Sequence, residues 1–246
     1  MTIGSIRNVL NVGNIFLVLL LLLLTLVSLH QRDQKMTRTT MKAMTYRAKD
    51  IYVAITGANA ERESLGLPLI WPKTVCLMTN RVDDGASKTY RTSTEYFQAL
   101  YDETNRATTN RGWSIKGFDY SRCAGAGVKA CTNATLTAEH NAWLIAANVT
   151  EEDDDRIPLL ISRNVDARLI EEAVNKGITT SDFHKRLSLG RGKYKNPFGQ
   201  TGFVLIRKGG GTLCVMSHYA TLGAIAGREV LPPRDPSKPP IVYLEP

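Results

Sequence analysis

The stretch IFLVLLLLLLTLVSL, residues 15–29, decides what kind of protein this 246-residue chain can be. Thr25 and Ser28 are its only polar members, and in a helix their hydroxyls can bond to carbonyl oxygens of the preceding turn. Extended back to Val9, the run contains 21 uncharged residues, which is about 31 Å of helix at ~1.5 Å per residue. That length matches the hydrocarbon core of a bilayer. The sequence therefore predicts one membrane-spanning helix over residues 1–30.

A cleaved secretory signal is the alternative interpretation of this run. Such signals have apolar regions of ~7 to 15 residues that end in small side chains, whereas this run ends in Leu29-His30-Gln31-Arg32. We therefore expect an uncleaved anchor. Between His30 and Asp50 the chain has six Lys or Arg and two Asp. Taken alone, the positive-inside rule would place this flank in the cytoplasm.

The helix is predicted to continue beyond the anchor as an amphipathic helix over residues 31–66. No Pro occurs between Gln31 and Leu65, and Gly57 is the single Gly. Apolar side chains recur at alternating steps of three and four residues, which places them on one stripe of the helix. This stripe is expected to pack against the globular part, and its residues are Met41, Met44, Ala48, Ile51 and Ile55.

The globular head is predicted over residues 67–231, with an α+β fold. Thr92 followed by Glu95 is a capping box that starts a helix, and a further helix is expected from Asp166 to Lys176. Apolar runs predict strands at 142–149 and 158–162, which an acidic turn separates. A glycine-rich turn at 208–211 predicts a hairpin that joins strands 202–207 and 212–217.

These strands are expected to form an antiparallel sheet that buries one face against the apolar stripe of the long helix. The tail, residues 232–246, has six prolines and cannot form regular structure except as an edge segment at 241–244.

Motifs for catalysis are absent from the sequence, which contains no His-Glu-x-x-His, no Gly-x-Ser-x-Gly and no phosphate-binding loop. We therefore predict a protein that is not an enzyme and has no cofactor. Carboxylates gather only at Glu151–Asp155, where Asp153, Asp154 and Asp155 are weak candidates for a calcium site. A solvated acidic loop is the alternative, because the Asp-x-Asp-x-Asp-Gly pattern is missing.

The net charge of +8 and the basic segment 184–195 raise the question of nucleic-acid binding. A solvated basic face is the simpler explanation, and no DNA-binding motif accompanies the segment. We predict no specific nucleic-acid partner. Of the four cysteines, Cys123 and Cys131 bracket a short loop that could bend to allow a disulfide. Buried thiols are the equal alternative for so few cysteines.

Several segments resemble type IV pilins and type II secretion pseudopilins, in particular pseudopilin-like proteins of the Verrucomicrobia and Lentisphaerae group of bacteria. An N-terminal apolar helix that continues as an amphipathic helix before a sheet is the first likeness. The others are residues 46–52 leading to Leu69-Ile70-Trp71-Pro72-Lys73, Thr94-Glu95-Tyr96-Phe97, Asn141-Ala142-Trp143, residues 158–164 and the closing glycine-rich hairpin. Together they cover most of the chain.

The resemblance implies a structural subunit that forms a helical filament with copies of itself and with other pilin-like subunits. Before assembly the subunit would be anchored in the inner membrane with its head in the periplasm, and the filament would be periplasmic or extracellular. The filament core would be formed by apolar helices packed together. Its contacts would come from Ile15, Phe16, Leu17, Leu20, Leu24 and Val27.

An alternative function is a membrane-anchored binding or sensor domain that does not polymerise. Pilins usually carry a glutamate as the fifth mature residue, and the first 31 residues of this chain contain no acidic residue. These two functions differ in whether the apolar helix contacts neighbouring copies. A membrane-anchored hydrolase is a third alternative, and it rests only on scattered Ser, His and Asp residues.

Overall fold

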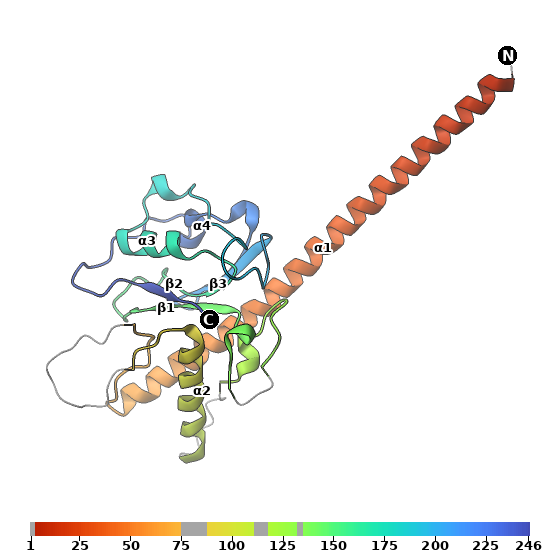
Figure 1. Ribbon diagram of the computed structural model, residues 1–246. Helices are drawn as coiled ribbons and strands as arrows, with labels where there is room; N and C mark the ends of the chain where they lie inside the picture. Colours follow the sequence, from red (N-terminus) through yellow and green to blue (C-terminus); the bar gives the residue numbers. More distant parts are fainter. Residues whose placement is uncertain (1–2, 75–87, 111–117, 132–134) are drawn as a thin grey trace. The chain divides into compact units, whose positions relative to one another are not determined.

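The computed structural model describes residues 3–74, 88–110, 118–131 and 135–246, without the side chains of 3–15, 29–34 and 106–110. The chain divides into two compact units, Met1–Thr40 and Met41–Pro246. The second, which we call the globular unit, is α+β with a five-stranded antiparallel sheet, as predicted (Figure 1).

Helix α1 spans Ile3–Ser64. The uninterrupted helix predicted from Gln31 onward is confirmed, and it ends where the sequence changes to Gly66 and Pro68. Gly66 has a φ of +66°, a conformation that glycine adopts without a steric penalty. Leu67 N donates a hydrogen bond of 2.8 Å to Arg62 O, which satisfies one of the last carbonyls of the helix.

The sheet has the strand order β4-β3-β2-β1-β5. Its strands are β1 (Trp143–Ala147), β2 (Pro158–Ser162), β3 (Gly202–Arg207), β4 (Thr212–Met216) and β5 (Val242–Leu244). All four pairings are antiparallel. The predicted hairpin is confirmed, and its turn is closed by a 2.8 Å hydrogen bond from Arg207 N to Gly211 O.

The edge segment predicted in the proline-rich tail is also confirmed, because β5 pairs with β1. Short hydrogen bonds fix the chain before it. Asn175 accepts from Ile241 N at 2.8 Å and donates to Ile241 O at 2.8 Å. The tail is therefore part of the fold and covers one edge of the sheet.

Helix α2 spans Ser93–Asn110 and begins at the predicted cap. Thr92 Oγ1 accepts from Glu95 N at 3.1 Å, while the Glu95 carboxylate accepts from Arg91 N, one residue before the expected partner. Helix α3 spans Arg168–Lys176, two residues shorter than predicted, because Asp166 lies before the helix and accepts from Arg168 N. Helix α4, Leu222–Ala226, was not predicted.

Both faces of the sheet are covered, which differs from the single buried face that we expected. Residues 41–64 of α1 and helix α2 lie on one side, and α3 and α4 lie on the other (Figure 1). Side chains of β1 alternate between the two layers, with Trp143 and Ile145 on the α1 side and Leu144 and Ala146 on the α3 side. The reason is visible in the strands themselves, which are continuous apolar runs without polar alternation.

Candidate assembly surface

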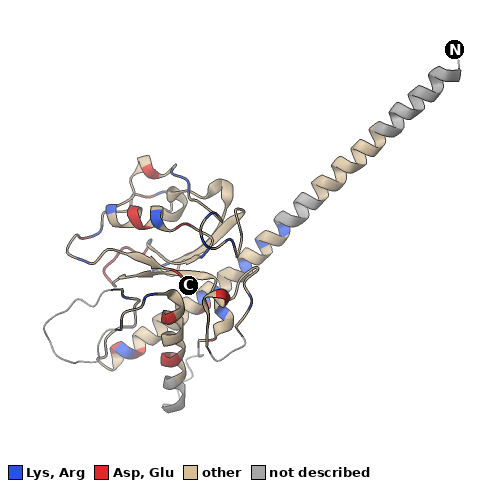
Figure 2. Cartoon of the chain, viewed as in Figure 1, with Lys and Arg blue, Asp and Glu red and all other residues tan. Residues whose placement is uncertain are grey.

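The apolar stretch of α1 is exposed on every side. Between Phe16 and Val27, eleven large apolar side chains are 41% to 68% exposed. Thr25, the one polar residue among them, donates from Oγ1 to Leu22 O at 2.7 Å, so its hydroxyl is satisfied within the helix. Figure 2 shows no charged residue in the described part of this stretch. The segment thus presents a ring of apolar surface with no partner in the described chain.

The residues predicted for the filament core belong to this surface. Phe16, Leu17, Leu20, Leu24 and Val27 are all exposed, and the side chain of Ile15 lies outside the described residues. Among the residues that the structure describes, no helix is both long enough and apolar enough to cross a membrane.

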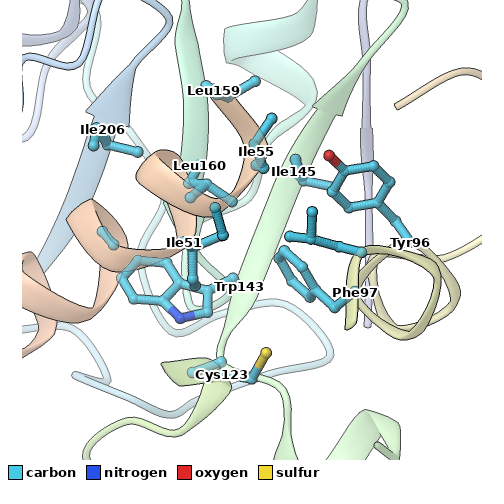
Figure 3. Packing of buried hydrophobic residues seen from close by; sticks show 14 of the residues in the cluster. Ile51, Ile55, Tyr96, Phe97, Cys123, Trp143, Ile145, Leu159, Leu160 and Ile206 are labelled. Atoms are coloured by element: carbon cyan, nitrogen blue, oxygen red, sulfur yellow. The ribbon is translucent and has the colours of Figure 1, made fainter. Parts of the chain in front are cut away.

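The predicted stripe on the following part of α1 is buried in the core. Met41, Met44, Ala48, Ile51 and Ile55 are each exposed by 1% or less. They belong to one cluster with apolar residues of α2 and of strands β1, β2 and β3. Figure 3 shows Ile51 and Ile55 beside Trp143, Leu160 and Phe97. The prediction that this stripe packs against the sheet is therefore confirmed.

Polar contacts attach the same part of α1 to neighbouring segments at three positions along the helix. Arg47 Nη1 donates to Ala124 O at 2.8 Å, and Asp50 pairs with Arg122 at 2.8 Å. Further along, Asn59 Oδ1 accepts from Ile70 N at 2.6 Å. Residues 41–64 are thus an integral element of the globular unit rather than a peripheral helix.

No disulfide joins Cys123 and Cys131 in the structure, which corrects the pairing that the loop length suggested. Cys123 is fully buried in the core, and Cys131 Sγ donates to Thr135 O at 3.3 Å. Burial raises the pKa of the Cys123 thiol well above its usual value, and the nearby Cys131 adds to the shift. Cys123 is therefore an unreactive thiol that packs as a small apolar side chain.

The acidic turn does not form the calcium site for which it was a candidate, because its carboxylates are paired with basic side chains. Asp153 pairs with Arg234, Asp154 with Arg156 at 2.6 Å, and Asp155 with Lys208 at 2.8 Å. The hydrogen bonds from Arg156 lower the pKa of Asp154. Across the described residues, no cluster of three or more His, Cys, Asp or Glu is placed to hold a metal ion.

Arg186 and Arg163 each line a cavity of the globular unit, and neither of these two cavities is lined by a histidine. The first, of about 440 Å³, is lined mainly by residues of the basic segment together with Gln200 and Ser217. The second, of about 340 Å³, lies beside Arg163, Asp166 and Glu171. The basic segment was predicted as a solvated face. The first cavity was not predicted, because Gln200 and Ser217 in its walls lie outside that segment.

Comparisons of the chain with protein-family models, with curated proteins and with solved structures found no match. The two features of α1 that bear on function are the exposed apolar surface at 16–27 and the buried stripe that follows it.

Proposed function

We propose that this chain is a pilin-like structural subunit that polymerises through its N-terminal helix into a type IV pilus or a type II secretion pseudopilus. The observation that carries the proposal is the ring of eleven exposed large apolar side chains between Phe16 and Val27. Burying one such side chain is worth ~1.5 to 3 kcal/mol. A surface of this size therefore needs a cover, either acyl chains or the same segment of other copies.

The physical role of such a subunit is packing rather than catalysis. The apolar helix is stored in the inner membrane, with the globular unit in the periplasm, and on assembly it exchanges lipid for neighbouring helices. The packing of residues 41–58 of α1 into the core of the globular unit supports this role, because the chain that leaves the apolar segment is then part of the folded head. Repetition of one contact from subunit to subunit without closure produces a helical polymer.

A membrane-anchored binding or sensor domain that does not polymerise is the second candidate. The lack of any acidic residue in the first 31 residues favours it, since pilins usually carry a glutamate near the mature N-terminus. The same apolar ring would then contact lipid only. The two functions differ in one measurable respect, which is whether the segment 16–27 contacts the same segment of several other copies.

Cysteine crosslinking in membranes tests this difference. Pairs of cysteines, such as Leu17→Cys with Leu24→Cys and Leu20→Cys with Val27→Cys, are introduced into a background in which Cys76, Cys131 and Cys214 are serine. Two cysteines per chain allow a polymer to form ladders beyond the dimer upon oxidation. A matched control carries both cysteines at exposed positions of α3, such as Arg168→Cys and Glu172→Cys.

Ladders of trimers and larger species that depend on cysteines within 16–27 are the expected result. Monomers and dimers alone, at every pair of positions tested, would contradict polymerisation and favour the sensor function. Ladders of equal intensity from the α3 control would indicate random collision in the membrane and would also count against the proposal.

A further inference from the structure

The larger of the two cavities described above is lined by side chains that donate hydrogen bonds and carry positive charge. Its polar lining consists of Arg186, Ser188, Arg191, Gln200 and Ser217, and no lining residue is acidic. Its volume of about 440 Å³ lies within the ~300 to 1,000 Å³ that small-molecule sites usually occupy. The cavity therefore has the size and the charge of a site for an anionic ligand.

The fold holds the cavity walls in place through backbone pairing. Leu187 N donates to Ala220 O at 2.9 Å, and Asp166 N donates to Ser188 O at 2.9 Å. Leu187 and Leu189 are buried in the layer under α3 and α4. In an extended segment alternate side chains point to opposite sides, so Arg186 and Ser188 are directed away from that layer.

Gly190 brings the remaining wall residues together. Its φ is +62°, and a Cβ atom added there would lie 2.6 Å from the carbonyl carbon of Gly199. Only glycine permits this approach of two backbone segments. The contact places Arg191 and Gln200, which follow these two glycines, at the same cavity.

The polar groups in this lining are largely uncommitted. Arg186 makes one long bond, from Nη2 to His218 O at 3.4 Å. Within the described part of the chain, the side chains of Ser188, Arg191, Gln200 and Ser217 make no hydrogen bond or ion pair. Guanidinium groups bind carboxylate, sulfate and phosphate through paired N–H donors. Free hydroxyl and amide groups add donors and acceptors suited to a ligand rich in hydroxyls.

The second cavity lacks this combination because its charges are balanced internally. Arg168 pairs with Asp166 at 2.5 Å, and Glu171 accepts from Tyr243 N at 2.6 Å. Its lining contains three carboxylates beside its basic residues. The contrast shows that the uncompensated positive charge of the larger cavity is a local property and does not simply reflect the net charge of +8.

We infer that the larger cavity binds a negatively charged sugar unit, whose acid group lies between Arg186 and Arg191 and whose hydroxyls contact Ser188, Gln200 and Ser217. Tyr219, which is 63% exposed, lies on the same short turn as Ser217. A single-stranded nucleic acid is less suited, because such strands bind along grooves with several aromatic platforms. The site belongs to the globular unit alone and goes beyond the proposed assembly function.

Isothermal titration calorimetry on the full-length chain in detergent micelles tests this inference, with trigalacturonate as the probe. Maltotriose serves as the uncharged sugar, inorganic phosphate as the bare anion and an oligothymidylate as the nucleic acid. We expect trigalacturonate to bind at least ~10-fold more tightly than maltotriose, since charge-assisted hydrogen bonds are stronger than those between neutral groups. Binding should weaken with added salt, because exposed charges are screened.

The variant Arg186→Ala/Arg191→Ala should lower the affinity for trigalacturonate at least ~10-fold. The matched control, Arg168→Ala/Lys176→Ala, removes the same charge from α3 and should change the affinity less than about twofold. The variant Arg186→Lys/Arg191→Lys keeps the charge but loses the planar donor pairs, so its affinity should be intermediate. Thermal unfolding of each variant identifies any loss of fold.

Four results would overturn the inference. They are the absence of trigalacturonate binding, an equal loss of affinity in the α3 control, tighter binding of the oligothymidylate, and displacement of trigalacturonate by an equal concentration of phosphate. The last would assign the cavity to a bare anion rather than to a sugar. None of these outcomes affects the crosslinking pattern of residues 16–27, so the two hypotheses can fail separately.

Discussion

Arg234 and Asp153 form an ion pair inside the globular unit, with 3.4 Å between Arg234 Nη2 and Asp153 Oδ2. Only 4% and 5% of their side chains are exposed. Asp153 also accepts from Thr150 N at 2.6 Å, while Arg234 Nη2 donates to Asn148 O. Burial lowers the pKa of Arg234, and two of its nitrogens, Nε and Nη1, have no partner among the described residues. The proline-rich tail is therefore attached to the β1–β2 turn by a buried ion pair. If one partner is removed, little water can reach the other to compensate its charge.

Removing one member of this ion pair should strongly lower the stability of the globular unit. We expect Asp153→Asn to lower the free energy of unfolding by ~3 to 5 kcal/mol, because the buried Arg234 charge loses its counter-ion. Urea unfolding monitored by circular dichroism measures the change. The control is Glu172→Gln, whose partner Lys176 is 75% exposed, and it should leave the unfolding midpoint unchanged. A midpoint for Asp153→Asn equal to that of the control would contradict the prediction.

Two buried tyrosines should make the fold sensitive to alkaline pH. Burial raises the pKa of Tyr96 and of Tyr243 well above 10. A folded pKa that exceeds the unfolded value stabilises the protein fully below the unfolded pKa of ~10. This contribution is then lost as the pH rises further toward the folded pKa. Stability measured by urea unfolding should therefore fall above about pH 10, and less steeply in variants that lack either phenol.

The same two tyrosines should differ at neutral pH. Tyr243 donates from its hydroxyl to Pro158 O at 2.7 Å, so Tyr243→Phe leaves a buried carbonyl without that donor and should cost ~1 to 3 kcal/mol. The Tyr96 hydroxyl has no partner among the described residues, and Tyr96→Phe should be neutral or stabilising. Equal losses of stability in the two variants would show that the hydroxyl of Tyr96 is satisfied in the folded protein.

Gly202 and Gly192 provide a matched test of packing at the sheet. A Cβ atom at Gly202 would lie 2.5 Å from Val215 O of the paired strand and 3.0 Å from Met41 Cε, whereas nothing lies within 4 Å of one at Gly192. Gly202→Ala should therefore lower stability by ~1 to 3 kcal/mol through overpacking. Gly192→Ala should have little effect on the same urea midpoint. If both substitutions are tolerated equally, β3 and β4 are not as close at this position as the structure indicates.

The sequence predicted those parts of the fold whose signal is local. The stripe from Met41 to Ile55 and the strands at 158–162 and 202–207 follow from the spacing of apolar residues, and all three are confirmed. Helix α4 has a cap at Thr221, whose hydroxyl accepts from Ala224 N, and an end at Gly227 with a φ of 73°. With only five residues it is too short to show a helical period, which explains why it was missed.

Other features depend on residues that the chain brings together from a distance. The acidic turn was a calcium candidate because Arg234 and Lys208, which neutralise it, lie more than fifty residues away in sequence. The larger cavity depends on the contact between Gly190 and Gly199. No periodicity or motif encodes such a contact, so the ligand site could not be predicted from the sequence.

Two substitutions on helix α1 should separate assembly from folding. Leu24 is 53% exposed in the apolar ring, so Leu24→Asp should abolish filaments by placing a charge in the apolar contact, with no change in the stability of the globular unit. Ile51 is fully buried, so Ile51→Ala should instead lower the free energy of unfolding by ~2 to 5 kcal/mol. Negative-stain microscopy of sheared cell-surface material and urea unfolding are the two measurements.

Leu24→Ala is the matched control for the charge, because it shortens the side chain but keeps it apolar. It should retain filaments at reduced number, whereas Leu24→Asp should give none although the protein still accumulates in the membrane. Filaments that form equally well with Leu24→Asp would show that residues 16–27 do not pack against other copies. The apolar ring would then serve only as an anchor, because an aspartate at one position of a lipid-facing helix disturbs no protein contact.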